Sequence, residues 1–80
     1  MVRYAIVRRI NNESAQIEKD SFGICACSVS DGLVEIVSCV DNISDDIVWV
    51  RTLSDKLNQY EVDPIHLYDI VEDELYALRA

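Results

Sequence analysis

The sequence predicts a two-layer α+β domain, in which a three-stranded antiparallel meander is covered by two C-terminal helices. Three observations support this prediction. The first forty residues are rich in β-forming side chains with a period of two, and the pair Asp31-Gly32 marks a tight hairpin turn among them. After residue 44 the apolar side chains recur at helical spacing instead. We expect residues 1–80 to form a single domain, because a chain of this length has room for one core.

Three strands are expected in the first half of the chain. The first covers residues 2–10 and the second covers residues 16–29. Gly23, in the middle of the second strand, predicts a bulge or a close approach of two backbones. The third strand covers residues 33–40 and lies at an edge of the meander with one charged side chain. We expect this edge to be covered, most simply by a second copy of the chain in a homodimer.

Two helices are expected in the second half of the chain. The first covers residues 45–60, with Ser44 as its N-cap. The second covers residues 64–79, and its start is marked by Asp63 as N-cap and Pro64 at the first helical position. The apolar stripes that face the sheet are predicted to be Ile47, Val50, Leu53, Leu57 and Tyr60 in the first helix, and Leu67, Val71, Leu75 and Leu78 in the second.

The composition argues against several classes of function. The formal net charge is −8, whereas binding to nucleic acid or to an anionic membrane needs clustered Lys and Arg. An acidic mimic of nucleic acid is disfavoured too, because ten of the fifteen acids lie in residues 41–80 rather than along the whole chain. The apolar run at residues 4–7 is too short for a secretory signal or a membrane span, so we expect a cytoplasmic protein.

The sequence contains no catalytic motif. Its two glycines form no Gly-x-Ser-x-Gly turn and no glycine-rich loop for an oxyanion. The one histidine, His66, lies in the first turn of the second predicted helix beside local acids, where a surface role is expected. We therefore expect a protein that is not an enzyme, with no catalytic residue and no cofactor.

Cys25, Cys27 and Cys39 are the alternative candidate site, a thiol-based metal or redox centre. An odd number of cysteines does not make a disulfide framework, so we expect reduced, buried thiols. A Cys-x-Cys pair within a strand lacks the spacing of zinc ligands, so we assign no metal ligand. A two-residue hairpin turn would place Cys39 opposite Ile24, on the face away from Cys25, whereas a three-residue turn would bring it to the same face.

The last predicted helix carries the main candidate site, an interaction surface. Its outer face combines acids with apolar and aromatic side chains, which is typical of a docking patch. The residues of this predicted patch are Ile65, His66, Asp69, Glu72, Asp73 and Tyr76. Because the acids at residues 72–74 have no basic partner at helical spacing, we expect a basic protein partner and a binding or regulatory role.

Most of the chain resembles a known family, and the resemblance is most specific in the last third. Residues 63–73 are Asp-Pro-Ile-His-Leu-Tyr-Asp-Ile-Val-Glu-Asp, and residues 22–24 are Phe-Gly-Ile. These segments resemble a domain-of-unknown-function family of short proteins from Gram-positive anaerobes. Its members end in a Pro-x-His-Leu-x-Asp-Val-x-Glu-Asp helix and carry an aromatic-Gly-Ile segment in the sheet. The chain departs from this pattern at residues 25–27 and at Asn42. The resemblance implies a small cytosolic bacterial protein and implies nothing about mechanism.

Overall fold

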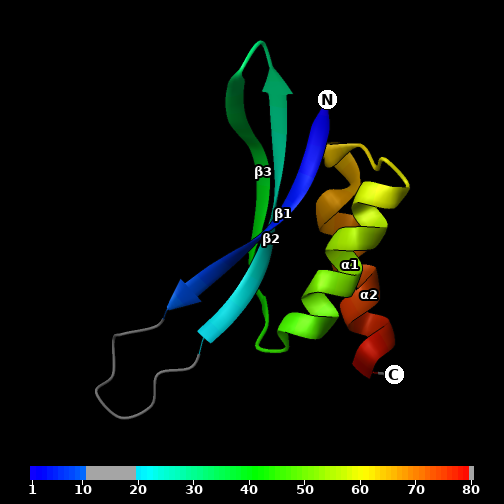
Figure 1. The fold of residues 1–80 in the computed structure, drawn as a ribbon. Coiled ribbons are helices and arrows are strands. Elements are labelled where there is room, and N and C mark those ends of the chain that lie inside the picture. The colour runs from blue at the N-terminus through cyan, green and yellow to red at the C-terminus, as the bar shows by residue number, and fades with distance from the viewer. Residues whose placement is uncertain (11–19, 80) are drawn as a thin grey trace.

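The computed structural model describes residues 1–10 and 20–79, and its sheet has helices on one side (Figure 1). Three antiparallel strands form the sheet in the order β1-β2-β3, and two helices follow, which confirms the predicted α+β fold. The elements are β1 (Val2–Ile10), β2 (Asp20–Ser30), β3 (Leu33–Ser44), α1 (Ile47–Gln59), the short 3₁₀ helix η1 (Pro64–His66) and α2 (Leu67–Arg79). The first part of the predicted second strand, residues 16–19, lies outside the described residues. None of the described helices is long and apolar enough to cross a membrane.

The pair Asp31-Gly32 forms the hairpin turn between β2 and β3. Both residues adopt positive φ, 51° and 77°, as the twisted two-residue turns of hairpins require. From this turn the strands pair in one register as far as Cys27 opposite Ile36, and Val37 is then an extra residue on β3. This bulge shifts the register by one residue along the next part of the hairpin.

A second bulge lies opposite Gly23. Residues 41–43 of β3 stand against Gly23 alone, and Asn42 among them has a φ of 55°. A Cβ atom at Gly23 would overlap the carbonyl oxygen of Val40 and would lie 2.9 Å from the Cα of Asp41. The close backbone approach predicted at Gly23 is therefore confirmed.

Two boundaries predicted near this second bulge are wrong. β3 continues to Ser44 instead of ending at residue 40, because the left-handed conformation of Asn42 is accommodated inside the strand. The N-cap of α1 is Asp46 and not Ser44, since the Asp46 carboxylate accepts hydrogen bonds from the N–H groups of Val48 and Trp49 at 3.0 and 3.3 Å. The hydroxyl of Ser44 accepts a bond from the N–H of Asp46 at 3.1 Å.

The end of α1 is closed by its own backbone. Glu61 adopts a φ of 49° and donates its N–H to the carbonyl of Asn58 at 3.2 Å. Val62 donates its N–H to the carbonyl of Leu57 at 3.1 Å. This pair of bonds is a Schellman motif, in which the left-handed position is usually a glycine.

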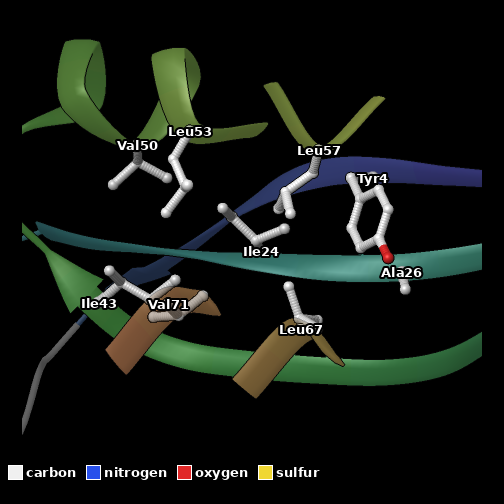
Figure 2. Close-up of a cluster of buried hydrophobic side chains, with 9 residues drawn as sticks. All are labelled: Tyr4, Ile24, Ala26, Ile43, Val50, Leu53, Leu57, Leu67 and Val71. Carbon is white, nitrogen blue, oxygen red and sulfur yellow. The ribbon is translucent and has the colours of Figure 1, made fainter. Parts of the chain in front are cut away.

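The core lies between the helices and the inner face of the sheet (Figure 2). Its buried members are Tyr4, Ile24, Ala26, Ile43, Val50, Leu53, Leu57, Leu67 and Val71. The predicted helical stripes are confirmed at their central positions, but Ile47, Tyr60 and Leu78 are exposed, at 40%, 72% and 58%. All three stand at the ends of their helices, where fewer elements surround a side chain.

Candidate functional site

The β1 edge of the sheet is capped by α1 at one residue, Tyr4. Asn58 accepts a hydrogen bond from the N–H of Tyr4 at 2.7 Å and donates its side-chain N–H to the carbonyl of Tyr4 at 3.0 Å. The hydroxyl of Ser54 donates a further bond to the same carbonyl at 3.4 Å. The Asn58 amide thus takes the place that another strand would occupy at this point of the edge.

The β3 edge has no such cap. Within residues 1–10 and 20–79, no group from outside the sheet forms a hydrogen bond with residues 33–40. Val29 donates its N–H to the carbonyl of Met1, so its backbone groups point to β1 and not to Val34, which lies opposite it on β3. Because bonding alternates along an antiparallel ladder, the N–H and C=O groups of Val34 and Ile36 point away from β2, to the outside of the sheet. The β3 backbone is therefore open to a further strand.

A groove lies beside this open edge, between β3 and the start of α2. It encloses about 520 Å³ and is lined by Val37, Ser38, Asp63, Pro64, Ile65 and Tyr68. Val37, Ile65 and Tyr68 are large side chains that remain more than half exposed. Asp63 caps η1 as predicted, accepting a bond from the N–H of Ile65 at 3.1 Å, with Pro64 at the first position. This local start signal therefore positions Ile65 at the groove.

One wall of the groove has an acidic rim. The hydroxyl of Tyr68 donates a hydrogen bond to the Glu72 carboxylate at 2.8 Å. This bond, together with the negative charge of Glu72, raises the pKa of Tyr68 above its usual value. Asp63 supplies a second carboxylate at the groove. The groove thus combines apolar walls with negative charge.

The six residues of the predicted docking patch are all exposed, and two of them lie at the groove. Ile65 lines the groove, and Glu72 borders it through Tyr68. Tyr76 follows Glu72 by one turn on the same flank of α2. The remaining three, on the solvent side of η1 and α2, are His66, Asp69 and Asp73. The groove therefore takes up one margin of the predicted patch, and the rest of the patch continues over the exposed face of η1 and α2.

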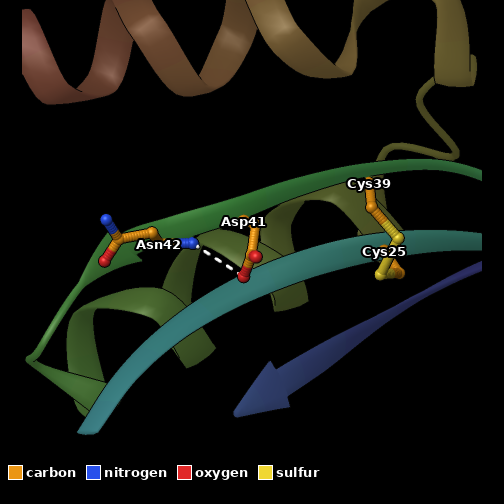
Figure 3. The surroundings of a disulfide bond; sticks show 4 residues. All are labelled: Cys25, Cys39, Asp41 and Asn42. Atoms are coloured by element: carbon orange, nitrogen blue, oxygen red, sulfur yellow. Dashed lines mark hydrogen bonds between the residues drawn. A yellow bond between two sulfur atoms is a disulfide. The ribbon is translucent and has the colours of Figure 1, made fainter. Parts of the chain in front are cut away.

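The cysteines differ from the reduced thiols that we predicted. Cys25 and Cys39 face each other across β2 and β3 and form a disulfide, with their Cα atoms 4.1 Å apart (Figure 3). The hairpin turn has two residues, but the bulge at Val37 shifts the register and so brings Cys39 to the face of Cys25. Cys27 is free and half-buried. Among the residues that the structure describes, no group of three or more His, Cys, Asp or Glu side chains is arranged to hold a metal ion.

Comparison with known protein families matches residues 1–77 to a family of unknown function (DUF6514). The match covers nearly the whole chain and confirms the expected relationship to a family without an assigned role. No curated protein and no solved structure matches the chain. The chain therefore belongs to the family of unknown function DUF6514.

Proposed function

We propose that this protein is a non-enzymatic binding module that takes an extended, basic segment of a partner protein onto the edge of β3. The observation that supports the proposal is the difference between the two edges of the sheet. Asn58 caps the β1 edge at Tyr4, whereas no such cap from the described residues lies on residues 33–40 of the β3 edge, which runs beside an apolar groove. Addition of a strand to an open sheet edge is a common mode of peptide recognition.

The geometry gives each part of the edge a role in binding. The outward N–H and C=O groups of Val34 and Ile36 would pair with the backbone of the added segment. Every second side chain of the segment would then point toward the groove and contact Val37, Ile65 and Tyr68. Covering these exposed side chains stabilises the complex by about 25 cal/mol for each Å² of apolar surface removed from water.

The charge around the groove favours a basic segment. Asp63 and Glu72 border the groove, and Asp69 and Asp73 lie on the adjoining face of α2. The chain as a whole carries a formal net charge of −8. These charges would steer a segment that contains Lys or Arg, and their effect is screened as salt is added. Binding should therefore weaken with increasing ionic strength.

A second copy of the chain is the alternative occupant of the β3 edge. Two copies would bring together two net charges of −8 and the acidic rims of both grooves. Like charges oppose such an association, whereas a basic partner gains from the same groups. The charge therefore favours a different protein over a homodimer.

Selection from a displayed library of random peptides tests the proposal. We expect peptides with a net positive charge in which apolar residues recur at every second position. Val34→Pro should abolish their binding, because it removes an outward N–H without removing a bond to β2. Ile65→Asp should also abolish binding, because it removes an apolar wall of the groove and sets a carboxylate against the apolar side chains of the segment. Val48→Asp is the matched control, since Val48 is nearly as exposed as Ile65 but lies on α1 and does not line the groove.

Three outcomes would contradict the proposal. The first is that no peptide is enriched. The second is that the enriched peptides bind Val34→Pro and Ile65→Asp as tightly as they bind the unmodified chain. The third is a dimeric mass by light scattering that Val34→Pro converts to a monomeric mass, which would assign the edge to a second copy.

A further inference from the structure

We infer that the Cys25–Cys39 disulfide is a reversible thiol–disulfide exchange site that controls the shape of the β3 edge. The effect of this site on the edge follows from the fold. Its effect on partner binding rests on the proposed function.

The disulfide lies on the face of the sheet that the helices leave uncovered. Ile24 and Ala26 of β2 are buried in the core, so Cys25 between them points to the opposite face. Cys25 itself is buried, but Cys39 on the edge strand is exposed. An external thiol therefore reaches the sulfur of Cys39 first.

A small dithiol, or a protein that carries a reactive dithiol, is the class of reductant that fits this site. One thiolate of the reductant attacks the Sγ atom of Cys39, the disulfide breaks, and Cys25 leaves as a thiolate. The second thiol of the reductant then attacks the first, which releases Cys39. The reductant loses two electrons and becomes a disulfide, while Cys25 and Cys39 gain two electrons and take up two protons to become thiols.

The disulfide and the bulge at Val37 depend on each other. With a two-residue turn and no extra residue, Cys39 would stand opposite Ile24 and would point to the other face. The bulge corrects the register by one residue and so allows the bond to form. Once formed, the bond holds Cys39 opposite Cys25, and the bulge cannot leave this part of β3. Reduction removes that constraint.

By fixing the bulge, the disulfide also fixes one wall of the groove. Val37 is the extra residue of the bulge and Ser38 follows it, and both line the groove. A change in the position of the bulge therefore moves this wall relative to Ile65 and Tyr68 on the opposite side. The oxidation state of the two cysteines thus sets the shape of the groove.

Cys27 supplies a matched control. It is a free thiol opposite Ile36, two residues from Cys25 and on the same face of the sheet. It takes no part in the bond, so Cys27→Ser should leave the exchange unchanged. In the cytoplasm, where the sequence leads us to expect this protein, disulfides are usually transient and redox-sensing.

The test equilibrates the 80-residue chain with reduced and oxidised dithiothreitol in set ratios, alkylates the free thiols and counts them by mass spectrometry. We expect one alkylated thiol in the oxidised form and three in the reduced form, which interconvert while the protein stays folded. Amide NMR shifts of the two forms should differ most at residues 36–40 and at Ile65 and Tyr68. Cys39→Ser should resemble the reduced form under both conditions, and Cys27→Ser should behave like the unmodified chain.

The inference is wrong if the disulfide is reduced only when the protein unfolds, or if the shifts at residues 36–40 are the same in both forms. A peptide selected on the oxidised form gives a separate readout, and we expect the reduced form to bind it about fivefold more weakly or worse. Equal affinity of the two forms would contradict redox control of binding. If no peptide binds either form, the proposed function fails, and the shift comparison alone decides whether the disulfide controls the edge.

Discussion

The side-chain amide of Asn58 pairs with both outward backbone groups of Tyr4, accepting from its N–H and donating to its carbonyl. This relationship between a helix and an edge strand makes the sheet asymmetric. α1 caps the β1 edge at Tyr4, whereas among the described residues no group outside the sheet bonds to residues 33–40 of the β3 edge. The proposed function follows from that asymmetry.

Asn58→Ala should lower the free energy of unfolding by about 1–3 kcal/mol, because it leaves the partly buried N–H of Tyr4 without a partner and its C=O with only the bond from the Ser54 hydroxyl. Urea denaturation measures the change. Gln59→Ala is the matched control, since its side chain is exposed and a change there should cost less than about 0.5 kcal/mol. Equal small effects of the two substitutions would show that Asn58 does not close the edge.

The apolar stripe of α2 is buried at its start and exposed at its end, so the loss of stability on substitution to alanine should decrease along the stripe. Leu67 is fully buried, so Leu67→Ala should cost about 2–5 kcal/mol through lost burial and the cavity left behind. Leu78 is 58% exposed, and Leu78→Ala should cost less than about 0.5 kcal/mol. Denaturant melts that rank the two substitutions the other way would contradict the packing of α2 described above.

Glu61→Gly should stabilise the protein. Glu61 occupies the left-handed position of the Schellman motif at a φ of 49°, where a side chain is strained and a glycine is not. We expect a gain of about 0.5–1 kcal/mol, partly offset by the greater freedom of glycine in the unfolded chain. Thermal melting should show a higher midpoint for Glu61→Gly but not for Glu61→Ala, and a lower midpoint for the glycine variant would be evidence against the motif.

We expect the free energy of unfolding to fall at alkaline pH because of Tyr4. Burial, and then the negative charge of Asp63, raise the pKa of Tyr4 above its ordinary value near 10. In the window above about pH 10 the unfolded chain has therefore lost this proton while the folded chain still holds it, so the free energy of unfolding falls as the pH rises. Tyr4→Phe should remove this component of the slope, and it should also cost about 1 kcal/mol at neutral pH because the bond from the Tyr4 hydroxyl to the Val62 carbonyl is lost.

Urea melts at a series of pH values measure the effect of Tyr4→Phe. Tyr60→Phe is the matched control, because the side chain of Tyr60 is exposed. An alkaline slope that is unchanged in Tyr4→Phe would contradict the assignment to Tyr4.

The fold could be predicted because its signals are local. Asp31-Gly32 has the residue types of a tight turn, and Asp63-Pro64 has those of a helix start, and the structure has both. The bulge at Val37 could not be predicted, because a valine has the same preference for a strand whether or not it is an extra residue. The register of Cys39, and with it the disulfide, depended on that one residue.

The groove was predicted only in part. Ile65 was recognised as an exposed apolar residue beside acids, and it does line the groove. Tyr68 is not among the residues of the predicted patch, and Val37 is one apolar residue of a predicted edge strand. The groove forms only because η1 and α2 pack against β3. This contact joins segments far apart in the sequence, so it could not be predicted from the residues of any one of them.

Backbone amide hydrogen exchange, measured on the free protein and on its complex with a selected peptide, tests the central claim about the two edges most directly. The account predicts that the amide of Tyr4 is protected in both states by Asn58. It predicts that the amides of Val34 and Ile36 exchange fast in the free protein and become protected when the peptide binds. Slow exchange at Val34 and Ile36 in the free monomer, or fast exchange there at saturating peptide, would contradict it.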